Sequence, residues 1–213
     1  MNRVAFLVDG FNVYHSLRAA QAVLGRKVRW LDLHGLCASY VHSSLFGSEA
    51  VLGSVIYFSA FATFFGPTKP GVLVRHRAYV RALEATGVDV AMGRFKPRQR
   101  RCTICGKVYL GYEEKETDVA IAVRIVELAL TRGHETIIVV TGDTDIIPAL
   151  RAARRLAPDK QLWVASPFQR YNRELRHSAD AGLKIRAEAY LRHQLPDPVI
   201  APDGSAIPKP PKW

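Results

Sequence analysis

Short apolar runs divide the chain into alternating strand and helix patterns. Five runs are rich in β-branched residues and lie at residues 4–8, 51–58, 88–92, 136–140 and 161–165. Runs of this length without polar alternation predict strands that are covered on both faces. Between the runs, apolar residues recur at helical spacing, which predicts helices at residues 13–24, 33–41, 72–87 and 118–130 and from residue 146 onward.

The order of these elements predicts a doubly wound α/β domain. Strands that alternate with helices form a parallel sheet through right-handed crossovers. The pattern covers residues 1–195, and a basic segment at residues 94–116 interrupts it. Residues 196–213 are rich in proline, which is typical of an extended or mobile tail. We therefore predict one folded domain, an insertion and a C-terminal tail.

Composition and charge indicate a class of partner and a compartment. Of the 213 residues, 48% are hydrophobic, which excludes a disordered chain. The 30 Lys and Arg exceed the 19 Asp and Glu, and the formal net charge of +11 favours polyanions, although a solubilising surface has the same composition. No apolar run reaches the ~20 residues of a membrane span, and the start of the chain lacks a signal-peptide pattern. We expect a cytoplasmic protein without a membrane partner.

Four aspartates lie where predicted strands end and a predicted helix begins. Asp9 directly follows the first strand, and Asp118 opens the fourth helix. Asp143 and Asp145 follow the fourth strand. In an open α/β sheet, functional groups gather at the carboxyl ends of the strands, where the strand order reverses. Because crowded oxygen ligands suit hard cations, the sequence predicts a Mg²⁺ or Mn²⁺ site that can act on a phosphodiester.

Three further polar residues accompany this cluster. Asn12, one helical turn after Asp9, could offer its amide to a metal-bound water or a phosphate oxygen, and Thr141 could bond to an aspartate or to the substrate. Glu116 is either a further acid of the site or a solvated side chain in front of the helix. Each acid alone has a simpler explanation as a helix cap or a turn residue. The metal-site interpretation depends on the four aspartates occurring together.

The motifs around these aspartates resemble a known family. VAFLVDGFNVY, EEKETDVAIAV and VVTGDTDIIPAL occur in this order, and with the later QLPDPV they make the chain similar to the NYN domain family, in its LabA-like (DUF88) branch of the PIN-like nucleases. The resemblance implies a PIN-like fold with strand order 3-2-1-4-5. It also implies a metal-dependent ribonuclease site that contains Asp9, Asn12, Asp118, Asp143 and Asp145. Thr141 and Thr144 stand where many relatives have serine.

Cations and aromatic rings surround the entrance to the fourth helix. The cations that we expect to contact nucleic acid are Lys69, Arg75, Lys96, Arg98, Arg101, Lys115 and Arg170. Phe95, Tyr109 and Tyr112 are interleaved with those of the insertion. Cations along a groove and rings on which bases stack are typical of single-strand binding. Taken one by one, each cation is explained equally well by a solvated surface.

The insertion also carries two closely spaced cysteines. Cys102 and Cys105 form CTICG, and two such thiolates can bind one Zn²⁺ ion. A closed site needs two more ligands, which His34 and Cys37 or a second subunit of a homodimer could supply. The alternatives are a redox-active pair or two reduced thiols. With three cysteines and no export signal, we expect no disulfide framework.

Together with the resemblance, these observations predict a metal-dependent ribonuclease that cuts RNA endonucleolytically, with Mg²⁺ or Mn²⁺ as cofactor. Asp9, Asp118 and Asp143 are the expected inner metal ligands, and Asp145 either binds metal or orients the attacking water. Three alternatives remain: a non-catalytic RNA-binding or regulatory module, a toprim-like phosphodiester enzyme and a small-molecule phosphatase. The position of Asp118 on a separate helix argues against the toprim-like class.

Overall fold

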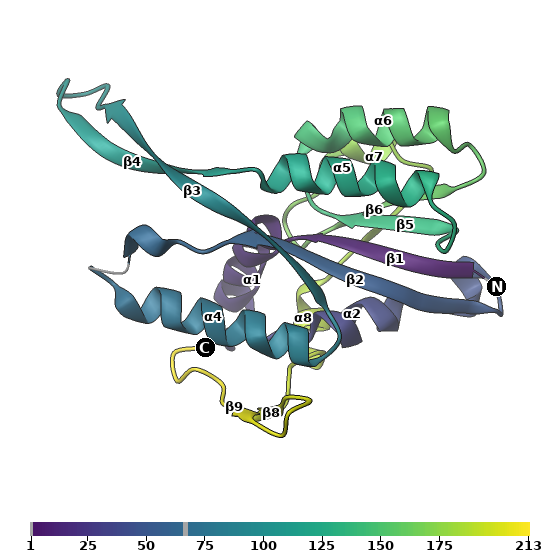
Figure 1. Ribbon diagram of the computed structural model, residues 1–213, viewed down its shortest axis with the longest axis horizontal. Helices are drawn as coiled ribbons and strands as arrows, with labels where there is room; N and C mark the ends of the chain where they lie inside the picture. Colours follow the sequence, from purple (N-terminus) through teal and green to yellow (C-terminus); the bar gives the residue numbers. More distant parts are fainter. Residues whose placement is uncertain (1, 66–67) are drawn as a thin grey trace.

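A twisted sheet between two layers of helices forms the centre of the computed structural model, which describes residues 2–65 and 68–213 (Figure 1). Its strand order is β4-β3-β2-β1-β5-β6-β7. The strands are β1 (Asn2–Asp9), β2 (Ala50–Ala60), β3 (Asp89–Arg101), β4 (Val108–Lys115), β5 (Thr136–Val140), β6 (Gln161–Ser166) and β7 (Ala181–Lys184). All neighbours pair in parallel except β3 and β4. The doubly wound α/β prediction is confirmed, with β4 and β7 added at the edges of the predicted order.

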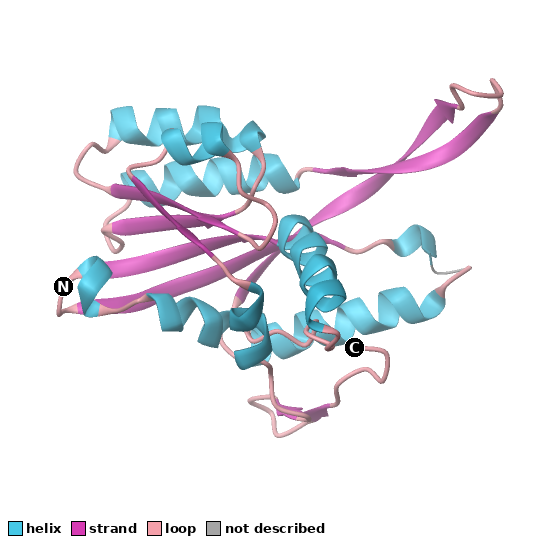
Figure 2. Cartoon of the chain, turned by 180° about the vertical axis from the view of Figure 1, so that it is seen from behind, coloured by secondary structure: helices cyan, strands magenta, loops and turns pink. Residues whose placement is uncertain are grey.

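The helices cover both faces of this sheet (Figures 1 and 2). One layer contains α5 (Thr117–Leu130), α6 (Ile147–Leu156) and α7 (Arg173–His177). The other contains α1 (Gly10–Leu24), α2 (Leu33–Tyr40), α4 (Pro70–Ala85) and α8 (Ala187–Arg192). Short turns of helix occur at α3 (Ser43–Phe46), η1 (Thr63–Phe65) and η2 (Thr144–Ile146). Within the described residues, no helix combines the length and the apolar character that crossing a membrane requires.

The uninterrupted apolar run of β1 has a direct structural reason. Successive side chains of a strand point to opposite faces of the sheet. Phe6 and Val8 therefore pack in one core, with residues of α1, α2 and α4, and Leu7 packs in the other, with residues of α5 and α6. Because each face of the strand meets a helix layer, no position from Val4 to Val8 is left to be polar, and the next polar residue is Asp9.

The basic segment at residues 94–116 forms most of a long antiparallel hairpin. Strands β3 and β4 pair from Arg94 with Lys115 out to Arg101 with Val108 without a register shift. The turn is closed by a hydrogen bond of 2.9 Å from the Cys102 backbone N–H to the Lys107 carbonyl. This hairpin projects away from the two helix layers (Figures 1 and 2). The predicted interruption of the α/β pattern is thus an extension of the sheet itself.

The proline-rich segment at residues 196–213 differs from the extended tail expected from its composition. It folds back onto the domain, where β8 (Val199–Ile200) and β9 (Ala206–Ile207) form an antiparallel pair. Val199 and Ile207 are buried in the α1–α2–α4 core, and the Trp213 ring lies 5.3 Å from that of Tyr79. Apolar side chains between the prolines therefore supply the surface that holds the segment. The domain boundary at residue 195 stays a prediction.

Candidate active site

The carboxyl ends of β1 and β5 meet at the switch point of the sheet. The two strands are parallel neighbours, and Val8 pairs with Val140. From β1 the strand order continues through β2 and β3 on one side, and from β5 through β6 and β7 on the other. Asp9 ends β1, and the loop with Asp143 follows β5. This is the position at which open α/β sheets bind ligands.

The Asp9 carboxylate is buried, with 3% of its surface exposed, and three donors fix its orientation. Its Oδ1 atom accepts the backbone N–H of Asn12 at 3.0 Å, so Asp9 caps α1. Its Oδ2 atom accepts the Asn12 side-chain amide at 2.6 Å and the Thr141 hydroxyl at 2.7 Å. The first turn of α1 and the loop after β5 are therefore joined through one carboxylate.

Asn12 and Thr141 also bind the loop that follows β5. The Asn12 side-chain oxygen accepts the Gly142 N–H at 3.3 Å, and the fully buried Thr141 hydroxyl accepts the Asp143 N–H at 3.1 Å. Of the two predicted roles for Thr141, the structure shows the bond to an aspartate. Asn12 therefore acts as a positioning residue for Asp9 and for the loop after β5. An amide NH₂ group has a second N–H, so its predicted donation to water or phosphate stays a prediction.

The cap explanation holds for two of the four aspartates. Asp9 caps α1, and Asp143 caps η2 by accepting the Asp145 N–H at 3.0 Å. Asp118, in the first turn of α5, makes no capping bond in the described part of the chain. Capping therefore does not account for the whole cluster.

Asp118 lies in a strongly negative environment. Burial raises the pKa of its carboxyl from 3.8 to about 6, and nearby charges add to the effect. These charges belong to Asp9, Glu114, Asp143 and Asp145. All four charges are negative, and each of them raises the pKa further. A site of this kind favours a bound cation.

Two glutamates next to α5 have different roles from those considered in the sequence. Glu116 has a left-handed backbone, with φ at 83°, and its carboxylate accepts the Arg94 Nε–H at 2.6 Å. Glu114 was not predicted as a site residue, yet its carboxylate accepts the Thr117 N–H at 2.9 Å beside Asp118. No signal in the sequence indicated this role, because it depends on the hairpin pairing, which sets Glu114 opposite Phe95 and was not predicted.

The carboxylates fit a hydrated divalent cation better than a preformed cage. Within residues 2–65 and 68–213, no three His, Cys, Asp or Glu side chains are arranged to hold one metal ion directly. Mg²⁺ usually keeps several of its waters and binds through one or two carboxylates together with substrate phosphates. The oxygen-only donors and the gathered negative charge around Asp118 suit such an ion.

The predicted cations fall into separate groups. Arg170 lines an open cleft with Arg18 and His15, and its backbone lies against the loop after β5. A Cβ atom on Gly142 would lie 2.3 Å from the Arg170 carbonyl oxygen, so only glycine permits this approach. The backbone of Arg170 therefore lies next to the loop that carries Asp143, and contact of its side chain with nucleic acid stays a prediction.

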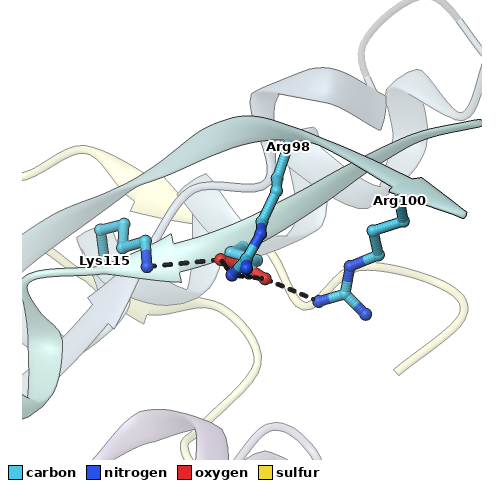
Figure 3. A network of polar contacts seen from close by, with 4 residues as sticks. Arg98, Arg100 and Lys115 are labelled. Atoms are coloured by element: carbon cyan, nitrogen blue, oxygen red, sulfur yellow. Dashed lines mark hydrogen bonds and ion pairs between the residues drawn. The ribbon is translucent and has the colours of Figure 1, made fainter.

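The hairpin cations lie mostly on the face that turns away from Glu114. Lys96 stands opposite Glu113, one position on from the Phe95–Glu114 pair, and therefore points to the other face. Glu113 accepts Arg98 at 2.8 Å and Arg100 at 2.9 Å, and Lys115 lies 3.3 Å away (Figure 3). These partners, Arg98 above all, lower the pKa of Glu113 to about 2. Arg101 alone of the predicted hairpin cations shares the face of Phe95.

Aromatic rings form a row from Asp9 to the hairpin. The Phe11 and Phe95 rings meet edge to face at 5.8 Å, and Phe64 meets Phe95 in the same way at 5.1 Å. Phe64 also stacks on Tyr112, with ring centroids 4.2 Å apart and planes 6° from parallel. Phe11 and Phe64 were not predicted from the sequence, because only the folded chain brings them to the hairpin. The Nζ atom of Lys69, a predicted nucleic-acid contact, lies 5.6 Å from the ring centroid of Phe65. Phe65 directly follows Phe64 in the chain.

The cysteine pair lies at the tip of the hairpin without further ligands from the described residues. Hydrogen bonds from the backbone of Cys105 and Ile104 lower the pKa of Cys102. Cys37 is 3% exposed and belongs to the core around α2, so the predicted completion of a zinc site by His34 and Cys37 is wrong. The fold places α2 against the body of the sheet, away from the projecting tip (Figure 1).

A mostly parallel sheet, flanked by helices and carrying carboxylates at its switch point, has the architecture of a PIN-like domain. The family model of the NYN domain matches residues 3–186, and the chain belongs to this family. Membership indicates a PIN-like nuclease. No curated protein matches the chain.

A solved structure supports the fold. The chain is similar to the crystal structure of a protein of unknown function from Vibrio parahaemolyticus, with a TM-score of 0.55. The two share 18% sequence identity, and the match covers 87% of this chain and 93% of the other. At this identity, the likeness shows the fold alone.

Proposed function

We propose that this protein is a cytoplasmic, divalent-metal-dependent endoribonuclease of the LabA-like branch. The observation that carries the proposal is the environment of Asp118, where burial and the negative charges of Asp9, Glu114, Asp143 and Asp145 together raise the pKa of the carboxyl to about 6. Repulsion between neighbouring carboxylates destabilises the folded state, so this arrangement has no structural benefit by itself. A cation held there in the presence of substrate accounts for it.

The side chains have distinct proposed roles. Asp118 and Asp143 hold the cation. Asp9 accepts the Thr141 hydroxyl, which in turn accepts the Asp143 N–H, so Asp9 helps to position Asp143. A bound Mg²⁺ or Mn²⁺ ion would polarise the phosphodiester and lower the pKa of a water molecule. Asp145 follows the η2 cap and is free to accept a proton from the attacking water. Arg170 and Arg18 bind phosphates in the cleft beside the carboxylates.

RNA is the favoured substrate because rings and cations border the acids on two sides. The aromatic row from Phe11 to Tyr112 offers faces on which unpaired bases stack. The cleft with Arg170 is lined by residues of α1 as well, His15, Arg18 and Ala19. A strand bound on both sides of the carboxylates continues in both directions, which favours an internal cut over removal of end nucleotides.

Cleavage of labelled oligonucleotides tests this function. Single-stranded RNA, structured RNA and DNA are incubated with Mg²⁺, Mn²⁺ or EDTA, using wild type, Asp118→Asn, Asp143→Asn and the control Asp159→Asn, which changes an exposed aspartate outside the site. We expect internal cuts in RNA only with metal, a loss of several orders of magnitude in rate for both site variants, and no loss for the control. Equal rates for wild type and both site variants would contradict the proposal.

A non-catalytic RNA-binding role is the second candidate. It is favoured by the lack, among the described residues, of three side chains that already coordinate one ion. In that case, wild type and Asp143→Asn bind RNA with the same affinity, and neither cuts it with any metal. Retained binding in EDTA together with metal-dependent cutting separates the two candidates.

A further inference from the structure

A cavity of about 300 Å³ lies between α1, β2 and α4, and its wall begins at Gly10, the residue after Asp9. Aromatic rings make up much of its wall: Phe11, Tyr57, Phe64, Tyr79, Phe95 and Trp213. Phe11 lies two positions after Asp9, and Phe95 stands opposite Glu114. The wall of the cavity therefore includes a residue close to Asp9 in the chain and a residue paired with Glu114 across the hairpin.

The charged side chains of this cavity are cationic. Arg29 and Arg75 contribute to its wall, and none of the described lining residues is acidic. The Arg29 Nε–H is buried without a hydrogen-bond partner among the described residues, while its guanidinium lies over the Tyr14 ring at 5.7 Å. A buried donor of a charged group is costly to leave unsatisfied, so it favours a ligand that supplies an acceptor.

Neutral polar groups complete the wall. The Ser59 hydroxyl lies 3.4 Å from the His76 Nε2 atom. Burial lowers the pKa of His76 to about 4, so its imidazole is neutral at physiological pH. A neutral imidazole has one donor and one acceptor nitrogen, and can therefore bind either kind of group on a flat heterocycle.

We propose that the cavity holds one unstacked nucleobase of the RNA substrate, with the adjacent phosphodiester positioned at the carboxylates. The inference rests on the proposed function, since it takes RNA as the substrate. Aromatic walls with a few polar groups are the usual surroundings of a base that has left its stack. The cationic groups and the absence of acids among the described lining residues disfavour an apolar peptide or lipid chain and fit a ligand that carries phosphate.

The location of the cavity gives a consequence for specificity. A base bound between Phe11 and His76 is read by fixed groups of the wall, whereas bases on the Phe64–Tyr112 stack meet only ring faces. We therefore infer a sequence preference at one nucleotide next to the cut and little preference farther along the strand.

Fluorescence of 2-aminopurine placed at each position of a short single-stranded RNA tests the inference. The measurement is made in EDTA, so that it does not depend on cleavage. We expect strong quenching at one position with wild type and also with Asp118→Asn. Ala62→Trp and, separately, Val72→Trp fill the cavity from half-buried positions of its wall, and each should abolish this quenching while RNA binding weakens only several-fold.

Arg29→Gln should reduce the quenching at that position, and Arg26→Gln, at an exposed arginine outside the cavity, should leave it unchanged. Thermal unfolding of each variant shows whether the fold is retained. In a separate experiment, free adenosine monophosphate competes with the labelled RNA for binding. If it restores the fluorescence at concentrations well below the millimolar range, the cavity is a mononucleotide site instead of an RNA subsite, and the proposal is overturned.

Quenching that persists in both folded tryptophan variants would also overturn it. The two proposals fail in different ways. If the protein binds RNA with the expected quenching but never cuts it, the base site stands and the nuclease function fails. If it cuts RNA with equal rates in the cavity-filling variants and without base preference, the nuclease function stands and the base site fails.

Discussion

The acidic loops and the β3–β4 hairpin, which border the same site, are constructed in opposite ways. In the acidic loops, Asp9 is 3% exposed and Thr141 is 0% exposed, and their polar atoms are joined by hydrogen bonds. Along the hairpin, apolar side chains stand in solvent, and Ile104 at the tip is 95% exposed. One region is fixed by the core of the fold, and the other by strand pairing together with ion pairs and ring contacts at its surface.

This difference matches what each region is proposed to do. Chemistry at a phosphodiester needs groups held within a fraction of an ångström, which a buried network supplies. Binding of a flexible strand needs broad surface and charge, and an exposed hairpin can supply these while it adjusts to its ligand. Changes in the acidic loops should therefore act on turnover, and changes in the hairpin on affinity.

The largest effect should come from removing the hydroxyl that joins the acidic loops. In Thr141→Val the shape is kept, but Asp9 loses a donor and the Asp143 N–H loses its acceptor. Leaving buried polar groups unpaired costs about 1–3 kcal/mol of unfolding free energy. We expect this loss in denaturant unfolding and a strong fall in kcat with little change in RNA affinity. Thr141→Ser keeps the hydroxyl and is the control; equal behaviour of both variants would refute the role of the bond.

The second effect concerns pH and metal. The folded protein holds the Asp118 proton with a pKa of about 6 against the ordinary 3.8, so the stability from this group is present below pH 3.8 and is lost as the pH rises through 6. In EDTA, Asp118→Asn should melt higher than wild type above pH 6, and the difference should shrink toward pH 4. Mg²⁺ should raise the melting temperature of wild type more at neutral pH than at pH 5, because protons compete for the same carboxylate. A Mg²⁺ effect of equal size in Asp118→Asn would contradict this.

A smaller effect is expected from charge on the hairpin. Neutralising Lys96, Arg98 and Arg101 together should weaken RNA binding. The slope of the logarithm of the binding constant against the logarithm of the salt concentration should become shallower by about one for each phosphate that the variant no longer binds. Arg98 should contribute least, because Glu113 already binds it. The cleavage rate of bound RNA should stay the same. The matched control neutralises three exposed arginines outside the hairpin, Arg26, Arg132 and Arg155. If the control changes the slope as much as the hairpin variant does, the effect comes from net charge and not from contacts of the hairpin.

The smallest effect should come from the cysteines at the tip. With two thiolates and no third ligand in the described chain, a zinc ion is held only if two chains bring their tips together. We expect metal analysis to find zinc in a dimer at one ion per two chains and none in a monomer. Cys102→Ser should release the ion and the dimer, while the melting temperature of the domain changes little. Zinc bound tightly to monomeric protein would contradict this arrangement.

Elements with strong local patterns were predictable from the sequence. The five middle strands follow from apolar runs, and the acids at their ends follow from the rule that strand ends meet at a switch point. The hairpin was not predicted, because its strands carry a mixture of charges and rings that does not separate the two faces by hydrophobicity. The packed proline-rich segment was missed because composition does not show which apolar side chains find a partner.

The sequence by itself determined the sheet, the order of its elements and the four aspartates at its edge, since these depend on local periodicity and on position after a strand. Only the tertiary structure decided what surrounds them. Asn12 became a positioning residue because Gly142 lies within its reach, and Glu114 joined the acids because the hairpin pairing turns it toward α5. The aromatic cavity has the same origin, because its wall combines residues from Gly10 to Trp213. Contacts between residues so far apart in the chain depend on packing, which no local pattern encodes.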